Sequence, residues 1–568
     1  MRYDESFDLV IVGSGAASVP AALVAKSLGR SALIIEKQPV FGGSTAYSGG
    51  VVWIPNSPLH GSRDSEEAGR TYLNALIGSK GGKASPPAKR EMFLKEGPKA
   101  IRFLLEQGVK FILVFWPDYY TELPGAHEYG RSLMCELFDI NELGEWKDKV
   151  GSFYGFPPLP VNSWEFVNLT LAKRTFKGKA AALRLAARMS WDKLTGQRRV
   201  GSGNALQGRM LQVALREQIP IRLSTAMTEL IVEGQRVTGV KTKGADGERL
   251  IEARHGVLLN TGGFSHNLAM RQAYQPAPAS VDWTMSNPGD TGEAIQLAQK
   301  LGADVDLMRE AWWTPGSLLP NGRYAGFHVP GESGKPHIII VDKNGRRLGN
   351  EAGAYMEFGQ RMFAAGAVPA FAIIESRALA HYTWGPLRTG AQIQSFIESG
   401  YLKSGATVRE LAQRCGIDAD GLEAEIAKFN KFAETGVDAD FGRGKSVYNR
   451  VMGDPTVKPN PSLGKIEQAP FYAVTIWPMD VGTSGGLVTD EYARVLRADG
   501  SVISGLYASG NATAPVVGAC YPGAGASIGG SLAFGYVAAH HALGTQQEQP
   551  RDSEPVQRPL ERAGANGP

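Results

Sequence analysis

The sequence predicts an α/β protein with a doubly wound sheet built from both chain ends and an α+β cap inserted between them. A short apolar segment beginning at Phe7 runs directly into a glycine-rich turn and a helix-forming stretch. A second strand, glycine-rich loop and helix pattern lies between Gly505 and Leu543. Glycine is also abundant, with 70 of 568 residues, which suits a backbone that must approach a ligand closely.

The composition excludes several classes of protein. Hydrophobic residues make up 43% of the chain and charged residues 20%, which is incompatible with wholesale disorder. The net charge of +4 gives no electrostatic footprint of nucleic-acid binding. Cys135, Cys415 and Cys520 are too far apart for a disulfide framework or a CxxC metal site, so we expect no metal. The acidic start and the absence of a long apolar run favour a cytoplasmic protein without a signal peptide or transmembrane helix.

The N-terminal pattern is that of a Rossmann-like dinucleotide-binding unit. Residues 7–12 read as a buried parallel strand, followed by a glycine turn and a helix over 19–28. A second strand over 32–35 ends in Glu36, and an acidic residue is typical about 20 residues beyond the glycine turn. Strand, turn, helix, second strand and acid agree with one another, so we expect a cofactor site here.

The glycine turn has a defined physical role. Gly13 permits the tight turn, and Gly15 lets backbone N–H groups approach a pyrophosphate at the helix N-terminus. Ser18 replaces the third glycine of the pattern, which we expect to weaken helix–strand packing without removing the phosphate site. Glu36 is expected to bind the adenosine ribose. The residues assigned to this half of the cofactor are Gly13, Ser14, Gly15, Ala16, Ala17, Glu36 and Lys37.

Further glycine-rich segments indicate FAD rather than the shorter NAD. Two of them, expected to be hairpins, follow Glu36 at once. Near the C-terminus, a glycine loop opens a helix whose N-terminus suits the negative pyrimidine edge of a reduced flavin. The residues assigned to the rest of the FAD are Gly42, Gly43, Ser44, Thr45, Ser48, Gly49, Gly50, Ala226, Gly262, Gly510, Asn511, Ser527 and Ile528.

These chain ends resemble the FAD-dependent family of fumarate reductases and succinate dehydrogenases. From about residue 7 to 543 the chain more closely resembles the 3-ketosteroid Δ1-dehydrogenases, also called 3-oxosteroid 1-dehydrogenases. The resemblance is weakest at about 135–200, where we expect an insertion. It implies a discontinuous FAD-binding domain over 1–312 and 483–545, a catalytic domain over 313–482, and a polar tail over 546–568 that we expect to be disordered.

Two departures distinguish the chain from the dicarboxylate enzymes of this family. The segment 480–486 lacks the histidine that the fumarate reductases place before a Gly-Gly turn. Ser44 stands before Thr45, where the succinate dehydrogenases have the histidine that bonds to FAD. The resemblance therefore implies noncovalent FAD and argues against a dicarboxylate substrate.

Three tyrosine-containing segments resemble those of the ketosteroid enzymes. They are Trp116-Pro117-Asp118-Tyr119-Tyr120, the stretch from Arg346 to Tyr355, and Tyr521-Pro522-Gly523-Ala524-Gly525. The resemblance assigns Tyr119, with Tyr120 as the alternative, and also Tyr355, Tyr521 and Gly525.

The implied reaction is the 1,2-desaturation of a 3-ketosteroid in steroid catabolism. Tyr355 would take the C2 proton with help from Tyr119, and the flavin N5 would take the C1 hydride. Tyr521 and the Gly525 N–H would polarise the C3 ketone, because the developing enolate needs preorganised donors.

Other functions stay open. They are desaturation at C4–C5 of a 3-ketosteroid, desaturation of a smaller alicyclic ketone, a fumarate-reductase-like activity and a non-catalytic flavoprotein. The sequence leaves the electron acceptor, the steroid side-chain preference and the oligomeric state open.

The stretch 173–199 mixes basic and apolar residues at helical spacing. Such a pattern is typical of a helix lying in a membrane interface. Steroids partition into membranes, so peripheral membrane contact through this stretch is one interpretation. A solvated surface helix and a dimer contact are the alternatives.

Overall fold

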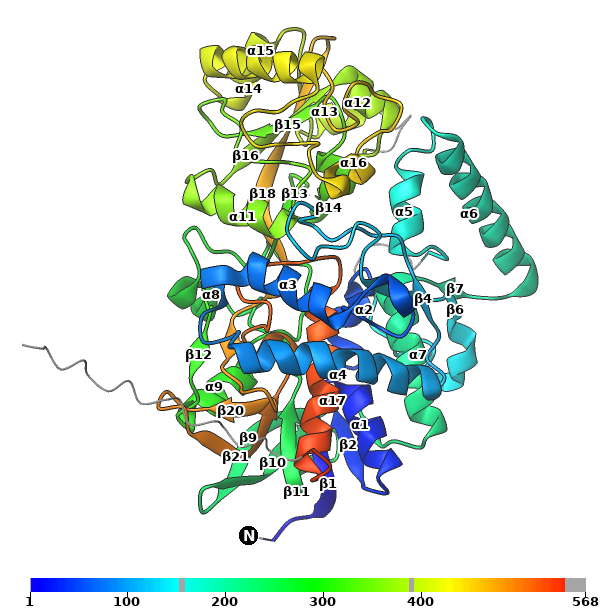
Figure 1. Ribbon diagram of the computed structural model, residues 1–568, viewed down its shortest axis with the longest axis vertical. Coiled ribbons are helices and arrows are strands. Elements are labelled where there is room, and N and C mark those ends of the chain that lie inside the picture. Colours follow the sequence, from blue (N-terminus) through cyan, green and yellow to red (C-terminus); the bar gives the residue numbers. More distant parts are fainter. Residues whose placement is uncertain (1, 153–158, 388–392, 547–568) are drawn as a thin grey trace, which may run out of the picture.

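The computed structural model describes residues 2–152, 159–387 and 393–546. Figure 1 shows two sheet-containing regions stacked along the long axis, with the N-terminal strand β1 (Glu5–Val12) and the C-terminal helix α17 (Ala526–Ala542) both in the lower one. The polar tail predicted to be disordered lies, from residue 547 on, outside the described residues.

The lower region is built on an eight-stranded sheet with the order β20-β21-β10-β11-β1-β2-β8, to which β9 adds by pairing with β10. β1 runs parallel to β2 and β11, whereas β9, β10 and β11 form an antiparallel meander. The strand bounds are β1 Glu5–Val12, β2 Ala32–Ile35, β8 Ile221–Arg222, β9 Ala226–Glu233, β10 Arg236–Gly244, β11 Gly247–Leu259, β20 Arg494–Leu496 and β21 Val502–Ala508.

Helices cover both faces of this sheet, which is why the central strands are apolar at residues 9–12, 32–35 and 257–259. Leu9 and Ile11 of β1 face the core that contains helices from both chain ends, whereas Val10 and Val12 face the core that contains α9. The covering helices are α1 Ser18–Ser27, α4 Pro87–Glu106, α7 Ser202–Arg216, α9 Glu293–Lys300 and α17 Ala526–Ala542. The predicted doubly wound α/β fold is confirmed.

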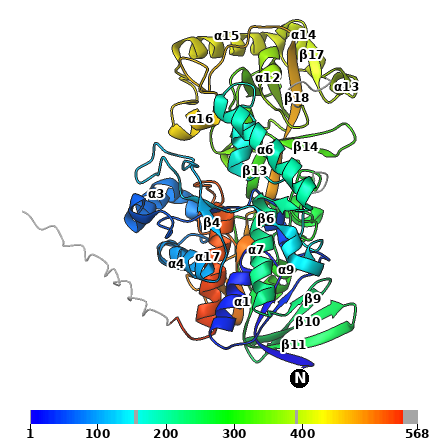
Figure 2. The same ribbon diagram turned by 90° about the vertical axis from the view of Figure 1, so that its right-hand side faces the viewer.

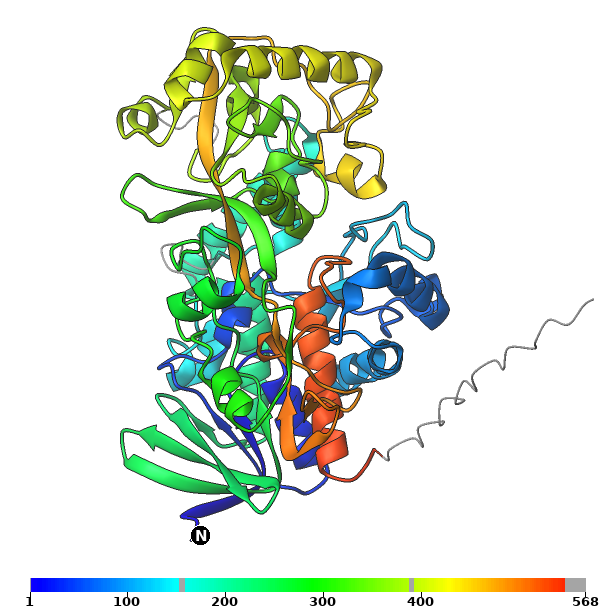
Figure 3. The same ribbon diagram turned by 90° about the vertical axis from the view of Figure 1, so that its left-hand side faces the viewer.

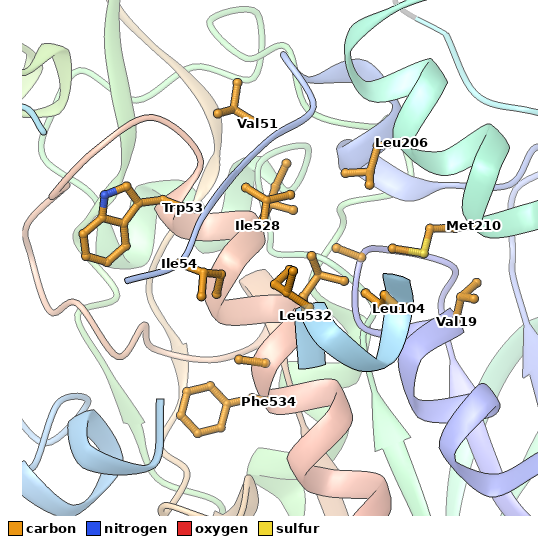
Figure 4. Close-up of a cluster of buried hydrophobic side chains, with 14 of the residues drawn as sticks. Val19, Val51, Trp53, Ile54, Leu104, Leu206, Met210, Ile528, Leu532 and Phe534 are labelled. Atoms are coloured by element: carbon orange, nitrogen blue, oxygen red, sulfur yellow. The ribbon is translucent and has the colours of Figure 1, made fainter. Parts of the chain in front are cut away.

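Helix α17 brings the C-terminal segment into the N-terminal core. A Cβ added at Gly535 would lie 2.6 Å from the Cβ of Ala17, so the absent side chain lets α17 lie directly against the start of α1. Figure 4 shows Leu532 and Phe534 of α17 among side chains that include Ile54 and Leu104. The FAD-binding residues predicted at opposite chain ends are therefore brought together by apolar packing.

The upper region is a six-stranded sheet with the order β14-β13-β18-β16-β15, with β17 paired to β18. Its strands are β13 Ala311–Leu318, β14 Tyr324–Phe327, β15 Ile338–Val341, β16 Ala370–Glu375, β17 Lys403–Gly405 and β18 Phe471–Thr483. Its helices include α10 Pro330–Ser333, α11 Tyr355–Ala364, α12 Ser376–His381, α14 Val408–Cys415, α15 Ala419–Thr435 and α16 Val447–Met452.

Two antiparallel strands, β13 and β18, connect the regions, and Figure 3 shows β18 running down from the upper region into the lower one. The register runs from Ala311 opposite Thr483 to Gly316 opposite Trp477. The boundaries that the sequence predicts, at 312/313 and 482/483, fall at one end of this strand pair. We therefore keep the division into two domains as an inference.

A helical pair projects from the side of the molecule (Figure 1). It consists of α5 Ser163–Leu169 and α6 Phe176–Thr195. The Thr175 side chain caps α6 by accepting the Gly178 N–H, and Gly196 ends the helix in a left-handed conformation. Figure 2 shows α6 lying on the face turned toward the viewer. Among the described residues, no helix is both long and apolar enough to cross a membrane.

One expected element differs. The first glycine-rich segment after Glu36 is not a hairpin but the start of the short helix α2 Gly43–Tyr47, with Gly42 as its N-cap. The second segment leads instead into β3 Val51–Trp53, which pairs with β5 Ser132–Cys135. The close pairing of glycines with small polar residues suits a helix start as well as a hairpin, so composition did not separate the two.

Candidate active site

A cavity of about 600 Å³ lies between the two regions and is lined by residues of both. All four residues assigned to catalysis line it, as do the residues assigned to FAD with two exceptions. Ala17 is buried against α17, and Gly42 uses its N–H to donate to Ser14 Oγ at 2.8 Å. The cavity therefore joins the predicted cofactor and catalytic residues in one space.

The first glycine turn is packed against the end of β11. Gly13 has a φ of +96°, and a Cβ there would lie 2.2 Å from the Asn260 carbonyl oxygen. Ser18 Oγ donates to the Gly13 carbonyl at 2.7 Å and accepts from Asn260 Nδ2 at 2.8 Å. The serine in place of the third glycine thus ties turn, helix and strand together, contrary to the weaker packing that we expected.

The groups at this turn fit the adenosine diphosphate part of FAD. No side chain caps the first turn of α1. The Ser18 N–H donates to the Gly15 carbonyl at 3.1 Å and Pro20 has no N–H, so the Val19 N–H is the first-turn donor left for a phosphate oxygen. Glu36 ends β2 and accepts hydrogen bonds from the Ser14 N–H and hydroxyl, at 3.0 and 2.7 Å. Burial raises the pKa of Glu36, and the N–H groups of Gln38 and Ser14 partly offset this.

A buried acid that the sequence did not reveal faces the same part of the cavity. Asp290 lines the cavity and accepts from Ser44 Oγ at 2.7 Å, and Ser44 Oγ in turn accepts from the Asn287 N–H. Burial raises the pKa of Asp290 to about 7. Lys37 is held at 2.9 Å by Glu293, which also lines the cavity. Asp290 stands in a loop without a recognisable motif, so only the folded chain shows its proximity to Ser44.

Three tyrosines from distant parts of the chain form one cluster. The ring centroids of Tyr119, Tyr355 and Tyr521 are 5.4 to 5.7 Å apart. Tyr120 is not among the cavity-lining residues, and its hydroxyl donates to Glu357 at 3.2 Å. This placement favours Tyr119 over Tyr120 as the tyrosine that acts in the site.

The Tyr119 loop is attached directly to the Tyr521 loop. The Tyr119 N–H donates to the Pro522 carbonyl at 2.9 Å, and the buried Tyr72 hydroxyl donates to the same oxygen at 2.7 Å. Asp118 accepts from Trp53 Nε1 at 2.8 Å and pairs with the buried Arg131. Two of the three clustered tyrosines are therefore held in a fixed relation by buried hydrogen bonds.

Tyr355 is the first residue of α11 and comes from the other region of the molecule. The segment before it is anchored by Glu351, which is buried and pairs with Arg347 at 2.8 Å and with Arg443 at 3.0 Å. Burial alone would raise the pKa of Glu351, but the two guanidinium groups hold it below its usual value. An ionised Glu351 thus fixes the position from which α11 starts.

Burial dominates the electrostatics of the cluster. It raises the pKa values of both Tyr119 and Tyr355 well above their usual value of 10.0. A hydrogen bond from Tyr119 acts in the opposite direction on Tyr355 and lowers its pKa. Both phenols are therefore neutral at pH 7, and the hydrogen bond from Tyr119 partly offsets the effect of burial on the pKa of Tyr355.

Gly525 stands where a side chain cannot fit. Its φ is +94°, and an added Cβ would lie 2.2 Å from the Val51 carbonyl oxygen. It is the N-cap of α17, so its N–H lies at the positive end of a 17-residue helix. Such a donor suits an oxygen that gains negative charge.

Two further aromatic residues, Tyr448 and Trp312, complete the site. The Tyr448 ring centroid is 4.5 Å from that of Tyr119, and Trp312 is 5.1 Å from Tyr521. Trp312 Nε1 also donates to Asn511 Oδ1 at 2.9 Å. Both line the cavity. Within the described residues, no group of three or more His, Cys, Asp or Glu side chains is placed to hold a metal.

Comparisons with known proteins agree with this architecture. The family model described as "FAD binding domain" matches residues 8–528. A 3-oxosteroid 1-dehydrogenase of Mycolicibacterium smegmatis is 42% identical over 94% of this chain and 97% of its own. A 4-oxocyclohexanecarboxylate 2-dehydrogenase of Sinomonas cyclohexanicum is 35% identical over 95% of this chain and 93% of its own.

A solved structure is similar over nearly the whole chain. It is the 3-ketosteroid Δ1-dehydrogenase of Sterolibacterium denitrificans in complex with 1,4-androstadiene-3,17-dione, with a TM-score of 0.88 and 34% identity. The similarity covers 95% of this chain and 100% of that one. The chain is thus a flavoprotein oxidoreductase that uses FAD. It belongs to the FAD-binding family that contains the 3-oxosteroid 1-dehydrogenases.

Proposed function

We propose that the protein is an FAD-dependent dehydrogenase that introduces a double bond between C1 and C2 of 3-ketosteroids. The observation that carries this function is the convergence of Tyr119, Tyr355, Tyr521 and Gly525 on a cavity that also contains the FAD-binding residues. Three phenol hydroxyls, each able to donate or accept a hydrogen bond, and one backbone N–H suit the removal of a proton next to a ketone.

The residues divide the work as follows. The Tyr521 hydroxyl and the Gly525 N–H donate to the C3 oxygen, which acidifies the C2–H bond and stabilises the enolate as it forms. The Tyr355 oxygen accepts the C2 proton, and the Tyr119 hydroxyl stabilises the phenolate that precedes this transfer. Bound FAD supplies the acceptor for the C1 hydride.

The function is tested by adding steroid to the oxidised holoenzyme without oxygen. A 4-ene-3-ketosteroid should bleach the flavin absorbance and give the 1,4-diene, identified by mass and NMR spectra. Persistent flavin colour with every ketone would contradict a desaturase. With a 5α-reduced 3-ketosteroid, a first double bond at C4–C5 would favour the alternative regiochemistry.

A smaller alicyclic ketone is the second candidate, because the dehydrogenase from Sinomonas cyclohexanicum is 35% identical over most of both chains. 4-Oxocyclohexanecarboxylate serves as the comparison substrate. Faster flavin reduction by this compound than by the steroid would replace the first proposal with the second.

We expect FAD to be held without a covalent bond. Among the described residues that line the cavity, none is a histidine or a cysteine, and Ser44 and Asp290 bond to each other beside Thr45. Acid precipitation should release the whole yellow chromophore into the supernatant. Colour that stays with the precipitated chain would disprove noncovalent binding.

We also propose that α6 contacts a membrane surface. Its exposed apolar side chains include Phe176, Leu183, Trp191 and Leu194, with exposed fractions from 58% to 87%. Lys177, Lys179, Arg184 and Lys193 of the same helix are exposed, and each basic residue near an anionic lipid surface contributes about 1 kcal/mol. α6 packs on α5, whose Phe166 and Val167 line the cavity. A membrane-bound α6 would therefore hold the cavity close to dissolved steroid.

Replacing both Leu183 and Leu194 by Asp should abolish sedimentation with phosphatidylglycerol vesicles at low salt. The wild-type protein should bind these vesicles more weakly as salt rises, because surface charges are screened. Val437→Asp, at an exposed valine outside α6, is the matched control and should bind normally. Equal sedimentation of the double variant would contradict the proposal, and a monomer–dimer difference by light scattering would assign α6 to a dimer contact.

A further inference from the structure

One wall of the cavity contains a carboxylate that the proposed reaction does not use. Glu332 belongs to α10 and lines the cavity, and 9% of its side-chain surface is exposed. Among the described residues between β13 and β18 that line the cavity, it is the one with an acidic side chain. The other acids on the lining, Glu36, Asp290 and Glu293, belong to the FAD-binding region.

A chain of buried hydrogen bonds fixes this carboxylate. The Tyr401 hydroxyl lies 2.9 Å from Ser317 Oγ, which lies 2.7 Å from His328 Nε2. His328 Nδ1 lies 2.9 Å from Glu332 Oε2. The Gly385 N–H donates to the same oxygen at 3.0 Å, and the Trp384 ring stacks on His328 at 4.0 Å between ring centroids.

In one of the proton arrangements that these distances allow, every hydrogen bond of the chain is satisfied. Tyr401 donates to Ser317, Ser317 donates to His328 Nε2, and the Nδ1 proton is donated to Glu332. In this arrangement Glu332 acts only as an acceptor, and it has acceptor capacity to spare because a carboxylate accepts about four hydrogen bonds. Within the described residues, Glu332 forms no ion pair with a lysine or arginine.

The order serine, histidine, acid is that of hydrolytic triads, but it does not make a nucleophile here. Ser317 and His328 are completely buried and do not line the cavity. The Ser317 hydroxyl is already hydrogen-bonded to both Tyr401 and His328. The acid, not the serine, lines the cavity, so the serine and histidine serve to orient the acid.

The position of Glu332 determines which part of a ligand it meets. The FAD-binding region holds the cofactor residues, and Tyr521 with Gly525 would hold the C3 ketone. Glu332 is hydrogen-bonded to neither set. The remaining part of a 3-ketosteroid is the end that carries the C17 substituent.

We propose that Glu332 is a specificity-determining residue that recognises the end of the substrate remote from the C3 ketone. A fixed carboxylate in an apolar wall accepts a hydrogen bond from a hydroxyl group and repels a second carboxylate. The substrates favoured are thus 3-ketosteroids with a hydroxyl or another neutral C17 substituent, and those with an acidic side chain are rejected. This inference rests on the proposed steroid desaturation.

The test compares three substrates that share the 4-ene-3-ketone and differ at C17: a ketone, a 17β-hydroxyl and a 17β-carboxylate. The kcat/KM of each is measured on the FAD-loaded enzyme. Wild type should use the carboxylate at least about tenfold less well than the ketone. Glu332→Gln keeps the size and an acceptor for His328 but removes the charge, and it should raise kcat/KM for the carboxylate by about tenfold relative to the ketone.

Two further variants make the result specific. Glu357→Gln removes a neighbouring acid that does not line the cavity, and it should leave the substrate ratios unchanged. Ser317→Ala keeps the Glu332 charge and should keep the rejection of the carboxylate. Flavin content and melting temperature check that each variant folds.

The inference is overturned if Glu332→Gln changes the carboxylate-to-ketone ratio by less than about twofold while it still uses the 17-ketone. An enzyme that desaturates none of the three steroids would instead contradict the proposed function. The two failures are therefore distinguishable.

Discussion

Tyr355→Phe is expected to lower turnover by about 10²–10⁴-fold, the usual contribution of a positioned general base. The ring remains, so its contacts with Tyr119 and Tyr521 should persist and FAD content and steroid affinity should change little. Single-turnover flavin reduction measures the effect on the chemical step, and a flavin absorbance titration measures the affinity.

Tyr120→Phe is the matched control for this variant. Tyr120 is adjacent to Tyr119 but bonds to Glu357 outside the cavity lining, so its loss should leave turnover nearly normal. A large loss for Tyr120→Phe together with a small one for Tyr355→Phe would show that the base is wrongly assigned.

The same assignment has a pH dependence with a definite sign. Burial raises the pKa of Tyr355 well above 10.0, so the phenolate needed to accept a proton is scarce at pH 7 and grows as pH rises. The rate of flavin reduction in wild type should therefore increase toward alkaline pH. The slope should disappear in the residual activity of Tyr355→Phe.

Tyr521→Phe is expected to lower the rate of flavin reduction by about 10²–10³-fold, the usual cost of losing one donor to an oxyanion. Substrate affinity should fall as well, because the same hydroxyl holds the ketone before reaction. The measurement compares KM and the reduction rate for a 3-ketosteroid in wild type and variant.

A 3-hydroxysteroid distinguishes the enolate mechanism from other roles of Tyr521. Wild type should desaturate the ketone but not the 3-hydroxy analogue, because a carbonyl is needed to acidify the neighbouring C–H bond. Equal rates for the two compounds would rule out the roles given to both Tyr521 and Gly525.

The sequence predicted those parts of the molecule that depend on local pattern. The strand, glycine turn and acid from Phe7 to Glu36 have a fixed spacing because they are expected to bind adjacent parts of one cofactor, the pyrophosphate and the ribose. The structure contains β1, α1 and β2 there. The doubly wound sheet was likewise predicted, because short apolar strands must be buried on both faces. The sequence also placed both chain ends at the cofactor site, but the packing of α17 against α1 is seen only in the structure.

Other parts depend on contacts between segments far apart in the sequence. Asp290, Tyr448 and Glu332 stand in segments with no distinctive spacing, and each reaches the cavity through the packing of its region. Ser18 is a further example, because its hydrogen bonds to Gly13 and Asn260 could not be predicted from the absence of a glycine at this position. The role of such single polar residues is recognised only once the structure shows which groups they contact.

The strand pair β13–β18 controls how accurately the proposed catalytic residues of the two regions are aligned with one another. Tyr521 and Tyr119 are fastened to the lower region, whereas Tyr355 starts α11, which packs on β13 where Gly359 lies against Trp313. The proposed proton acceptor therefore lies on one side of the strand pair β13–β18, and the proposed ketone donors lie on the other side. One residue of slippage along a strand is about 3.3 Å, whereas a misplacement of about 1 Å can cost 10²-fold in rate. In the proposed mechanism, the backbone hydrogen bonds between β13 and β18, from Ala311 to Gly316, therefore fix the distance over which the proton moves.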